Sequence, residues 1–153
     1  MNFEGTIPIK AAPAKVWDLL LDVERFSACV PGVEEVIQID ETTFDGVILA
    51  SVGPMSGKFS FRAQIVESSP PSEMVTELNG TDSVTKSAVT ASTRMRLTPT
   101  ADDGTELAYT STVDIRGRLA ILGDMVMRAT ATLILEELGN RMRRALEVET
   151  GGA

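Results

Sequence analysis

Apolar and polar residues alternate along much of the chain with the period of two that predicts β-strands. In the first such segment, residues 2–9, Phe3, Ile7 and Ile9 would share one face. Pro8 has no amide hydrogen for a neighbouring strand, so we expect this strand to lie at an edge of the sheet. Further strands are predicted near residues 33–40, 43–53, 57–68, 73–80, 84–97 and 105–117. The gaps between them are short enough for hairpins, which predicts an antiparallel meander.

Helical spacing replaces this alternation in two regions. After the first strand, Pro13 suits the first helical position, and apolar residues recur at helical spacing to about residue 21. Asp22 is a suitable N-cap for a second short helix over residues 23–30. The final region, from about residue 119 to 148, lacks proline and is rich in helix formers. It predicts one long C-terminal helix.

This order of elements predicts an α+β fold in a single domain. A chain of 153 residues has room for one sizeable core. The seven predicted strands would form an antiparallel sheet that curves around the long C-terminal helix, because no other element is long enough to cover the apolar face. We expect the domain to span residues 1–149, with residues 150–153 as a loose end.

The face of the predicted sheet that looks toward the long helix is apolar with a few hydroxyl groups. In the strand near 57–68, Phe59 and Phe61 alternate with Lys58 and Arg62, and the other strands repeat this separation. The inward hydroxyl groups belong to Thr76, Thr93, Tyr109 and Ser111. Such a lining is typical of a site that holds an apolar molecule and orients it with a few hydrogen bonds. The same residues could also form an ordinary core.

The amino-acid composition limits which kinds of catalytic and binding site the chain can form. The chain has no histidine, which excludes Ser-His and Cys-His nucleophile pairs and imidazole metal sites. Its one cysteine, Cys29, cannot form an internal disulfide, and we expect it to be a buried apolar residue with no basic partner nearby. The net charge of −8 disfavours nucleic acid as a partner. Without a signal-peptide pattern or a long apolar run, the sequence predicts a soluble, cytoplasmic protein.

Three separated blocks of residues along the chain show similarity to a known family. The first is AAPAKVWDLL at 11–20 followed by ERFSACVPG at 24–32, the second is VGPMSGKF at 52–59 and the third is GRLAILG at 117–123. In these blocks the chain resembles the CoxG family of carbon monoxide dehydrogenase subunits. The resemblance implies a START-like (SRPBCC) helix-grip fold and a ligand-holding role.

The resemblance also implies partners. Family members are associated with molybdenum-containing carbon monoxide dehydrogenases and related hydroxylases, in maturation or membrane recruitment, and are thought to accept lipophilic molecules such as quinones. Many carry a long C-terminal tail for membrane attachment, whereas this chain ends a few residues after its last predicted helix. We therefore expect at most transient membrane contact, or a peripheral position through a partner. No metal and no covalently bound cofactor are expected, and a quinone is the candidate ligand.

The leading hypothesis is a non-enzymatic carrier with no catalytic residue, whose cavity between the sheet and the long helix takes an isoprenoid quinone or another lipid-like molecule. Tyr109 and Ser111 would donate hydrogen bonds to a carbonyl headgroup. The predicted wall consists of Phe26, Phe59, Phe61, Met74, Thr76, Val89, Ala91, Thr93, Tyr109, Ser111, Val113, Leu119, Leu122, Met125, Val126 and Ala129.

Two other hypotheses stay open. A cyclase or hydrolase on the same fold would need an ionisable group in the cavity, so Arg62, Asp45 or Asp114 would have to face inward. An assembly adaptor without ligand would dock its partner through the loop from Gly53 to Gly57, chiefly Gly53, Pro54 and Met55, and the adjoining start of the long helix, since exposed loops often carry function. The sequence does not indicate an oligomeric state.

Overall fold

The computed structural model describes residues 1–52, 54–82 and 84–151, with side chains up to residue 147. Its strands are β1 (Asn2–Ile9), β2 (Val33–Gln38), β3 (Thr43–Val52), β4 (Met55–Ser69), β5 (Glu73–Asp82), β6 (Ser87–Pro99) and β7 (Thr105–Arg116). Its helices are α1 (Pro13–Leu21), α2 (Val23–Cys29), the 3₁₀ turn η1 (Arg118–Leu122) and α3 (Asp124–Gly151). Within the described residues, the predicted order of strands and helices is confirmed.

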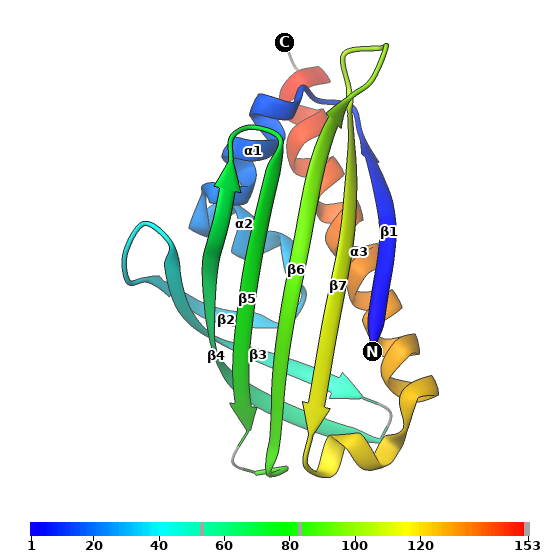
Figure 1. Ribbon diagram of the computed structural model, residues 1–153. Coiled ribbons are helices and arrows are strands. Elements are labelled where there is room, and N and C mark those ends of the chain that lie inside the picture. Colours follow the sequence, from blue (N-terminus) through cyan, green and yellow to red (C-terminus); the bar gives the residue numbers. More distant parts are fainter. Residues whose placement is uncertain (53, 83, 152–153) are drawn as a thin grey trace.

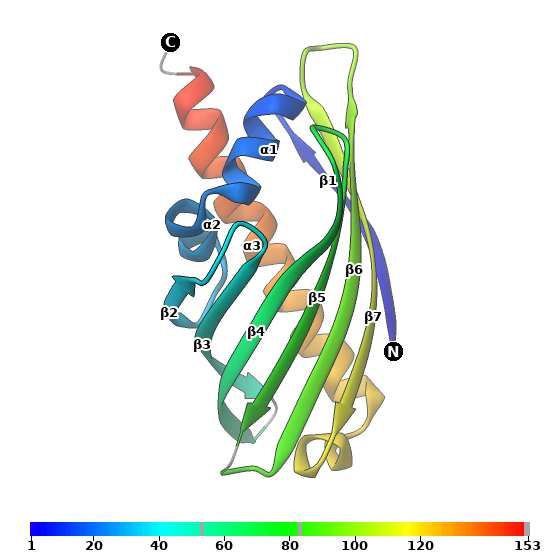
Figure 2. The same cartoon turned by 60° about the vertical axis from the view of Figure 1, so that its left-hand side comes forward.

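The strands form one antiparallel sheet in the order β1-β7-β6-β5-β4-β3-β2. The predicted meander is therefore confirmed, and β1, which contains Pro8, is an edge strand as expected. The sheet curves, and the long helix α3 runs along its concave side (Figure 1). In Figure 2 the short helices α1 and α2 lie on this same side, next to the C-terminal half of α3. The fold thus has a sheet layer and a helix layer, and the space of interest lies between them.

The two short helices follow the sequence signals closely. Pro13 is at the start of α1, and the Asp22 carboxylate accepts a hydrogen bond of 3.1 Å from the Arg25 amide at the start of α2. A side chain at this position satisfies an amide that has no partner inside the helix. The predicted N-cap is confirmed.

The long helix begins later than the sequence predicts. Residues 118–122 form the separate 3₁₀ turn η1, and Gly123 follows with φ of +84°. That backbone region suits glycine, which has no Cβ to clash, and it interrupts the helical path. The prediction of a continuous helix from Leu119 was therefore wrong, and α3 starts at Asp124.

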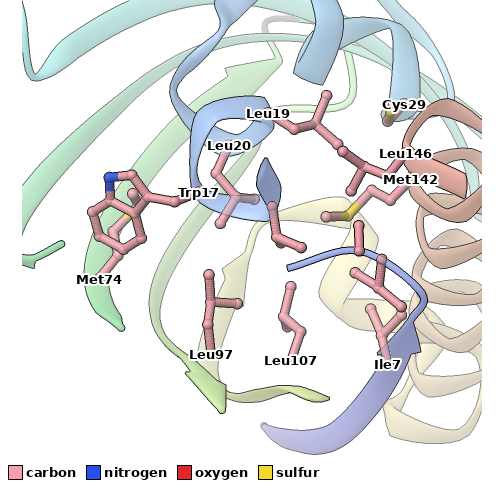
Figure 3. Close-up of a cluster of buried hydrophobic side chains, with 13 residues drawn as sticks. Ile7, Trp17, Leu19, Leu20, Cys29, Met74, Leu97, Leu107, Met142 and Leu146 are labelled. Atoms are coloured by element: carbon pink, nitrogen blue, oxygen red, sulfur yellow. The ribbon is translucent and has the colours of Figure 1, made fainter. Parts of the chain in front are cut away.

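Buried apolar side chains gather in two clusters at opposite ends of the space between sheet and α3. The α1 cluster consists of Ile7, Ile9, Ala11, Val16, Trp17, Leu19, Leu20, Cys29, Met74, Leu97, Leu107, Met142 and Leu146. Figure 3 shows these side chains pointing toward one another from α1, α3 and the strands. The η1 cluster is smaller and consists of Val52, Phe59, Leu119 and Met127.

Candidate functional site

A cavity of about 260 Å³ separates the α1 cluster from the η1 cluster. The sheet side of its wall comes from β1, β6 and β7, and Leu20 and Phe26 enter from α1 and α2. The helix side is formed by residues of α3 at spacings of three and four, namely Met127, Ala131, Ile134, Leu135, Leu138 and Met142. The cavity therefore occupies the middle of the space that α3 and the curved sheet enclose.

Three polar side chains reach this cavity, Thr93, Tyr109 and Ser111. Thr93 and Ser111 are opposite one another on β6 and β7, and their hydroxyl oxygens are 2.9 Å apart. One of these hydroxyls donates to the other, which leaves one hydroxyl hydrogen of the pair free to reach a ligand. The Tyr109 hydroxyl has no hydrogen-bond partner among the described residues. The sheet side of the cavity can thus donate hydrogen bonds to an acceptor on a ligand.

Gly5 makes room for the ring of Tyr109. The two residues are direct neighbours on β1 and β7, and a Cβ at Gly5 would lie 2.5 Å from the Tyr109 hydroxyl oxygen. Real atoms do not approach this closely, so any larger residue at position 5 would displace the ring. Glycine at this position therefore leaves the space that the phenol group occupies.

Arg128 joins α3 to the edge strand beside the cavity. Its guanidinium lies 5.3 Å from the centre of the Phe3 ring, and its Nη1 donates to the Asn2 carbonyl oxygen at 3.1 Å. Phe3 itself lines the cavity. A cation over an aromatic face is a favourable contact. This contact therefore links the first turns of α3 to β1 beside the cavity.

The charged side chains of the described residues lie outside the cavity. In the part of the chain that the structure describes, no Asp, Glu, Lys or Arg lines the cavity. Arg62 and Asp45 form an ion pair of 2.7 Å on the outer face of the sheet, and Asp114 pairs with Arg116 at 2.9 Å. Hydrogen bonds from Arg62 hold the pKa of the Asp45 carboxyl below its ordinary value. The ionisable residues that a cyclase or hydrolase site would need therefore do not reach the cavity.

A larger hollow, of about 580 Å³, lies across the outer face of β1, β7 and β6. Its lining includes Glu4, Ser92, Thr110 and Arg94, and the Arg94 guanidinium is already engaged by Glu67 and Glu73. Because its one basic side chain, Arg94, is paired within the protein, and Glu4 adds a negative charge, this hollow is less suited to an apolar ligand than the cavity under α3.

The predicted wall residues fall into several groups. Phe26, Thr93, Tyr109, Ser111 and Val113 line the cavity. A second group belongs to or packs against the η1 cluster and comprises Phe59, Val89, Leu119, Leu122 and Val126. Met74, which is 2% exposed, belongs to the α1 cluster.

The remaining predicted wall residues lie away from the cavity lining. Phe61, Thr76 and Ala91 are partly exposed residues of the inward face on β4, β5 and β6. Met125 is 86% exposed and Ala129 is also exposed, so both lie on the outer side of α3. The error at Met125 and Ala129 follows from the late start of α3, since the inward face of the helix is set by Met127.

Several cavity residues were not predicted, chiefly Ala131, Ile134, Leu135 and Leu138 of α3. Their spacing of three and four from Met127 was visible in the sequence and marks one face of a helix. The sequence did not show which face of the helix meets the sheet.

Of the predicted docking loop, Gly53 lies outside the described residues. Pro54 is exposed, whereas Met55 is partly buried and packs against the η1 cluster. Pro54 is thus the described residue of this loop that a partner can reach directly.

Cys29 is buried, at 3% exposed, and belongs to the α1 cluster, as predicted. Burial raises the pKa of its thiol, while the positive charges of Arg141, Arg25 and Arg144 act in the opposite direction. The prediction that no basic residue lies nearby was therefore wrong. Arg141 comes close because its Nη1 donates to the Ala28 carbonyl oxygen, at 3.4 Å, across the contact between α2 and α3.

The described part of the chain has neither a cluster of metal-ligating residues nor a membrane-spanning helix. No group of three or more His, Cys, Asp or Glu residues could hold a metal ion there. None of the described helices is both long enough and apolar enough to cross a membrane.

Comparison with known proteins decides the family. Residues 5–147 match the family of carbon monoxide dehydrogenase subunits described as CoxG. The chain belongs to the CoxG family. This confirms the resemblance inferred from the sequence blocks. No curated protein matches the sequence significantly.

Solved structures confirm the START-like fold. A conserved protein from Geobacillus kaustophilus is 23% identical with a TM-score of 0.89, and the match covers 96% of this chain and 95% of that one. A START superfamily protein from Mycobacterium smegmatis is 14% identical with a TM-score of 0.74, covering 95% and 97%. The Zhui aromatase/cyclase from Streptomyces sp. R1128 is 15% identical with a TM-score of 0.74, covering 98% and 95%. At these identities the likeness concerns the fold alone.

CoxG membership and the START-like fold together support a ligand-binding or carrier role. The family also implies a relation to carbon monoxide dehydrogenase. The chemistry of the cavity then indicates what kind of ligand to test.

Proposed function

We propose that this CoxG-family protein is a non-enzymatic carrier that holds an apolar, carbonyl-bearing molecule in the cavity between the sheet and α3. An isoprenoid quinone is the first candidate, and another lipid-like molecule is the second. The observation that carries the proposal is the lining: apolar walls, hydroxyl groups and, among the described residues, no charged side chain. A quinone matches this lining, because its ring is apolar and its carbonyl oxygens only accept hydrogen bonds.

The polar groups support a carbonyl headgroup. The Thr93 and Ser111 pair keeps one hydroxyl hydrogen free, and the Tyr109 hydroxyl can supply another. A hydrogen bond inside a largely apolar site contributes about 1 kcal/mol net, and a donor left without an acceptor there costs more. These residues therefore favour a ligand with carbonyl oxygens over a plain hydrocarbon.

The cavity volume sets the size of what it can enclose. At about 260 Å³ it lies just below the range of roughly 300–1,000 Å³ that is typical of small-molecule sites. It suits a ring with a short side chain better than a complete long-chain lipid. Each methylene group buried in the wall adds about 0.8 kcal/mol, so a few isoprenoid carbons suffice for useful affinity.

Family membership supports the proposed partner, which is a molybdenum-containing carbon monoxide dehydrogenase or a similar redox enzyme. We further propose that the carrier works in the cytoplasm and reaches the inner face of the membrane at most transiently. The cyclase alternative is less well supported, because Arg62, Asp45 and Asp114 lie in ion pairs outside the cavity.

The proposal is tested by extracting the purified protein with organic solvent and analysing the extract by mass spectrometry. Emptied protein is then titrated with a benzoquinone that carries one isoprene unit, and with an alkylbenzene of similar size that has no carbonyl groups. We expect saturable binding of the quinone and weaker binding of the alkylbenzene. An empty extract together with no binding of either compound would refute the carrier role, and equal affinities would refute the role of the hydroxyl groups.

A further inference from the structure

We propose that strand β2 is a docking site for an extended peptide segment of a partner protein, which pairs with it as a further strand of the sheet. The segment it fits has apolar residues flanked by basic ones. Strand β2 is last in the order of the sheet and, among the described residues, pairs with β3 alone. Figure 2 shows it at the margin of the sheet, below α2.

The two edges of the sheet differ in how they are protected. At the β1 edge, Pro8 offers no amide hydrogen, and Arg128 of α3 donates to the Asn2 carbonyl oxygen at 3.1 Å. Strand β2 contains neither proline nor a basic residue, both of which commonly protect an edge. Its bulge lies at its start, between Val33 and Glu35, so the rest of the strand keeps a regular register. The β2 edge is therefore the one that another strand can join.

The main chain of β2 has hydrogen-bonding groups on its outer side. The Ile39 amide donates to the Thr43 carbonyl oxygen at 2.8 Å, on the side of β3. In an antiparallel pair such bonds recur at every second residue, so Ile37 also directs its main-chain groups toward β3, whereas Val36 and Gln38 direct theirs away from it. No described strand lies on that side. An extended peptide could pair there with the amide and carbonyl groups of both residues.

Exposed apolar side chains accompany this edge. Ile37 is 56% exposed and Ile39 52%. Ile37 is the direct neighbour of Asp45, whose ion pair with Arg62 lies on the outer face, so both isoleucines point to that face. Leu49 of β3, on the same face, is 48% exposed. A single exposed apolar residue needs no explanation, but several on one face beside an unpaired strand form a surface that a partner can cover.

The charge of this region selects the partner. Residues 33–52 contain five acidic residues and no basic one. Two of the five are paired with basic residues of β4, Asp45 with Arg62 and Glu34 with Lys58 at 3.3 Å. Glu35 and Glu41, one on each side of the two isoleucines, are exposed and have no ion pair in the described part of the chain. A basic segment complements them, whereas a second copy of β2 would bring like charges together.

The alternation of a strand gives the pattern of the segment. Two apolar residues, two positions apart, would lie beside Ile37 and Ile39, with Lys or Arg two positions farther on at each end. The inference does not rest on the proposed ligand, because no residue of β2 lines the cavity.

The test is titration of the full chain with a labelled, end-capped peptide, Lys-Thr-Val-Thr-Val-Thr-Lys, followed by fluorescence anisotropy. One control peptide has Glu in place of both Lys, and another has Pro in place of the central Thr. One protein variant carries Ile37→Lys and Ile39→Lys, and its control carries Leu21→Lys and Leu133→Lys, which are exposed apolar positions elsewhere. A second variant, Gln38→Pro, removes an amide on the free side and leaves the pairing with β3 intact. Circular dichroism verifies that every variant is folded.

We expect saturable binding of the Lys peptide that weakens with salt. The Glu peptide, the Pro peptide and the Ile37→Lys, Ile39→Lys variant should each bind at least about tenfold more weakly. Gln38→Pro should lose about fivefold, which corresponds to one hydrogen bond, and the control variant should bind as the unchanged protein does. Failure of the Lys peptide to bind, or equal affinities of the Lys and Glu peptides, would overturn the proposal. A dimer of the protein alone in sedimentation velocity, dissociated by Ile37→Lys with Ile39→Lys, would also overturn it and assign the β2 edge to a second copy.

Discussion

The interior of the protein is packed tightly at one end of α3 and hollow in the middle. In the α1 cluster, Met142 and Leu146 of α3 are 1% exposed and meet buried residues of α1 and the sheet. Nearer the N-terminal end of the same helix, Ile134 and Leu135 face the cavity and are only partly buried. The packing differs because α1 fills the space between α3 and the sheet at one end, whereas no described element fills that space in the middle. One end of the interior can therefore stabilise the fold while the middle receives a ligand.

The hydroxyl groups of the two regions differ in the same way. In the α1 cluster region, Thr105 is 1% exposed and its hydroxyl donates to the Ala11 carbonyl oxygen at 2.6 Å. In the cavity, the Tyr109 hydroxyl has no partner among the described residues. A buried polar group that is already satisfied supports the fold, whereas an unpaired one at a cavity wall is available to a ligand.

The largest expected effect is on stability, from Leu19→Ala. Leu19 is fully buried in the α1 cluster, and truncating such a residue costs about 2–5 kcal/mol of unfolding free energy because a cavity is left behind. Leu135→Ala only enlarges a cavity that exists already, so we expect a loss of about 1 kcal/mol or less. Urea unfolding of both variants measures the two losses. Similar losses would show that the middle of the interior is packed as tightly as the end.

Gly5→Ala should have the next largest effect, because it should lower both the stability of the fold and the affinity of the cavity for quinone. The new Cβ would collide with the Tyr109 ring, so we expect a loss of about 1–3 kcal/mol in stability and weaker quinone binding. Gly80→Ala is the matched control, because its Cβ would meet other atoms only at 3.5 Å or more. Unfolding and quinone titration are measured on both. If Gly80→Ala weakens quinone binding as much as Gly5→Ala does, the position of the phenol group is not what matters.

Tyr109→Phe separates binding from stability. The hydroxyl has no partner among the described residues, so its removal should leave the unfolding free energy within about 0.5 kcal/mol. Affinity for the one-isoprene benzoquinone should fall about fivefold, which corresponds to one lost hydrogen bond. Thr105→Val should do the reverse, lowering stability and leaving affinity unchanged. An affinity unchanged by Tyr109→Phe would remove this residue from the binding site.

The smallest expected effect is the pH dependence of stability that Asp82, at the end of β5, contributes. Burial alone would raise the pKa of the Asp82 carboxyl, but hydrogen bonds from the Val84 amide and the Thr85 hydroxyl outweigh it and lower that pKa. Asp82 therefore stabilises the fold above the pKa of an unfolded carboxyl, about 3.9, and this contribution is lost as the pH falls through the lower folded value. Comparing acid unfolding of the protein and of Asp82→Asn tests this. We expect the difference in stability between them to shrink as the pH falls below about 4, and a constant difference would contradict the assignment.

Much of this fold could be predicted because strand alternation is a local signal. Phe59 and Arg62 lie on opposite faces of the sheet because successive side chains of a strand alternate, and the apolar face is the one that packs inward. Pro8 likewise marks an edge strand by its own chemistry. The hydroxyl groups at the cavity, among them Ser111, were found by this same alternation.

The helix side of the cavity could not be predicted in the same way. The inward face of a helix depends on where the helix starts, and the positive φ of Gly123 moves that start to Asp124. Met125 was therefore expected in the wall, where the structure has Met127. The position of the cavity also depends on how far α1 reaches along the sheet, which no local pattern contains. The approach of Arg141 to Cys29 is of the same kind, because it results from packing between α2 and α3.

One pair of variants tests the central claim, that the middle of the interior binds an apolar carbonyl compound. Ala131→Phe places a ring in the cavity, whereas Ala129→Phe places the same ring on the exposed side of α3. Both variants are titrated with the one-isoprene benzoquinone by quenching of Trp17 fluorescence or by calorimetry. We predict that Ala131→Phe abolishes binding and that Ala129→Phe binds as the unchanged protein does. Quinone binding retained by a folded Ala131→Phe variant would contradict the claim.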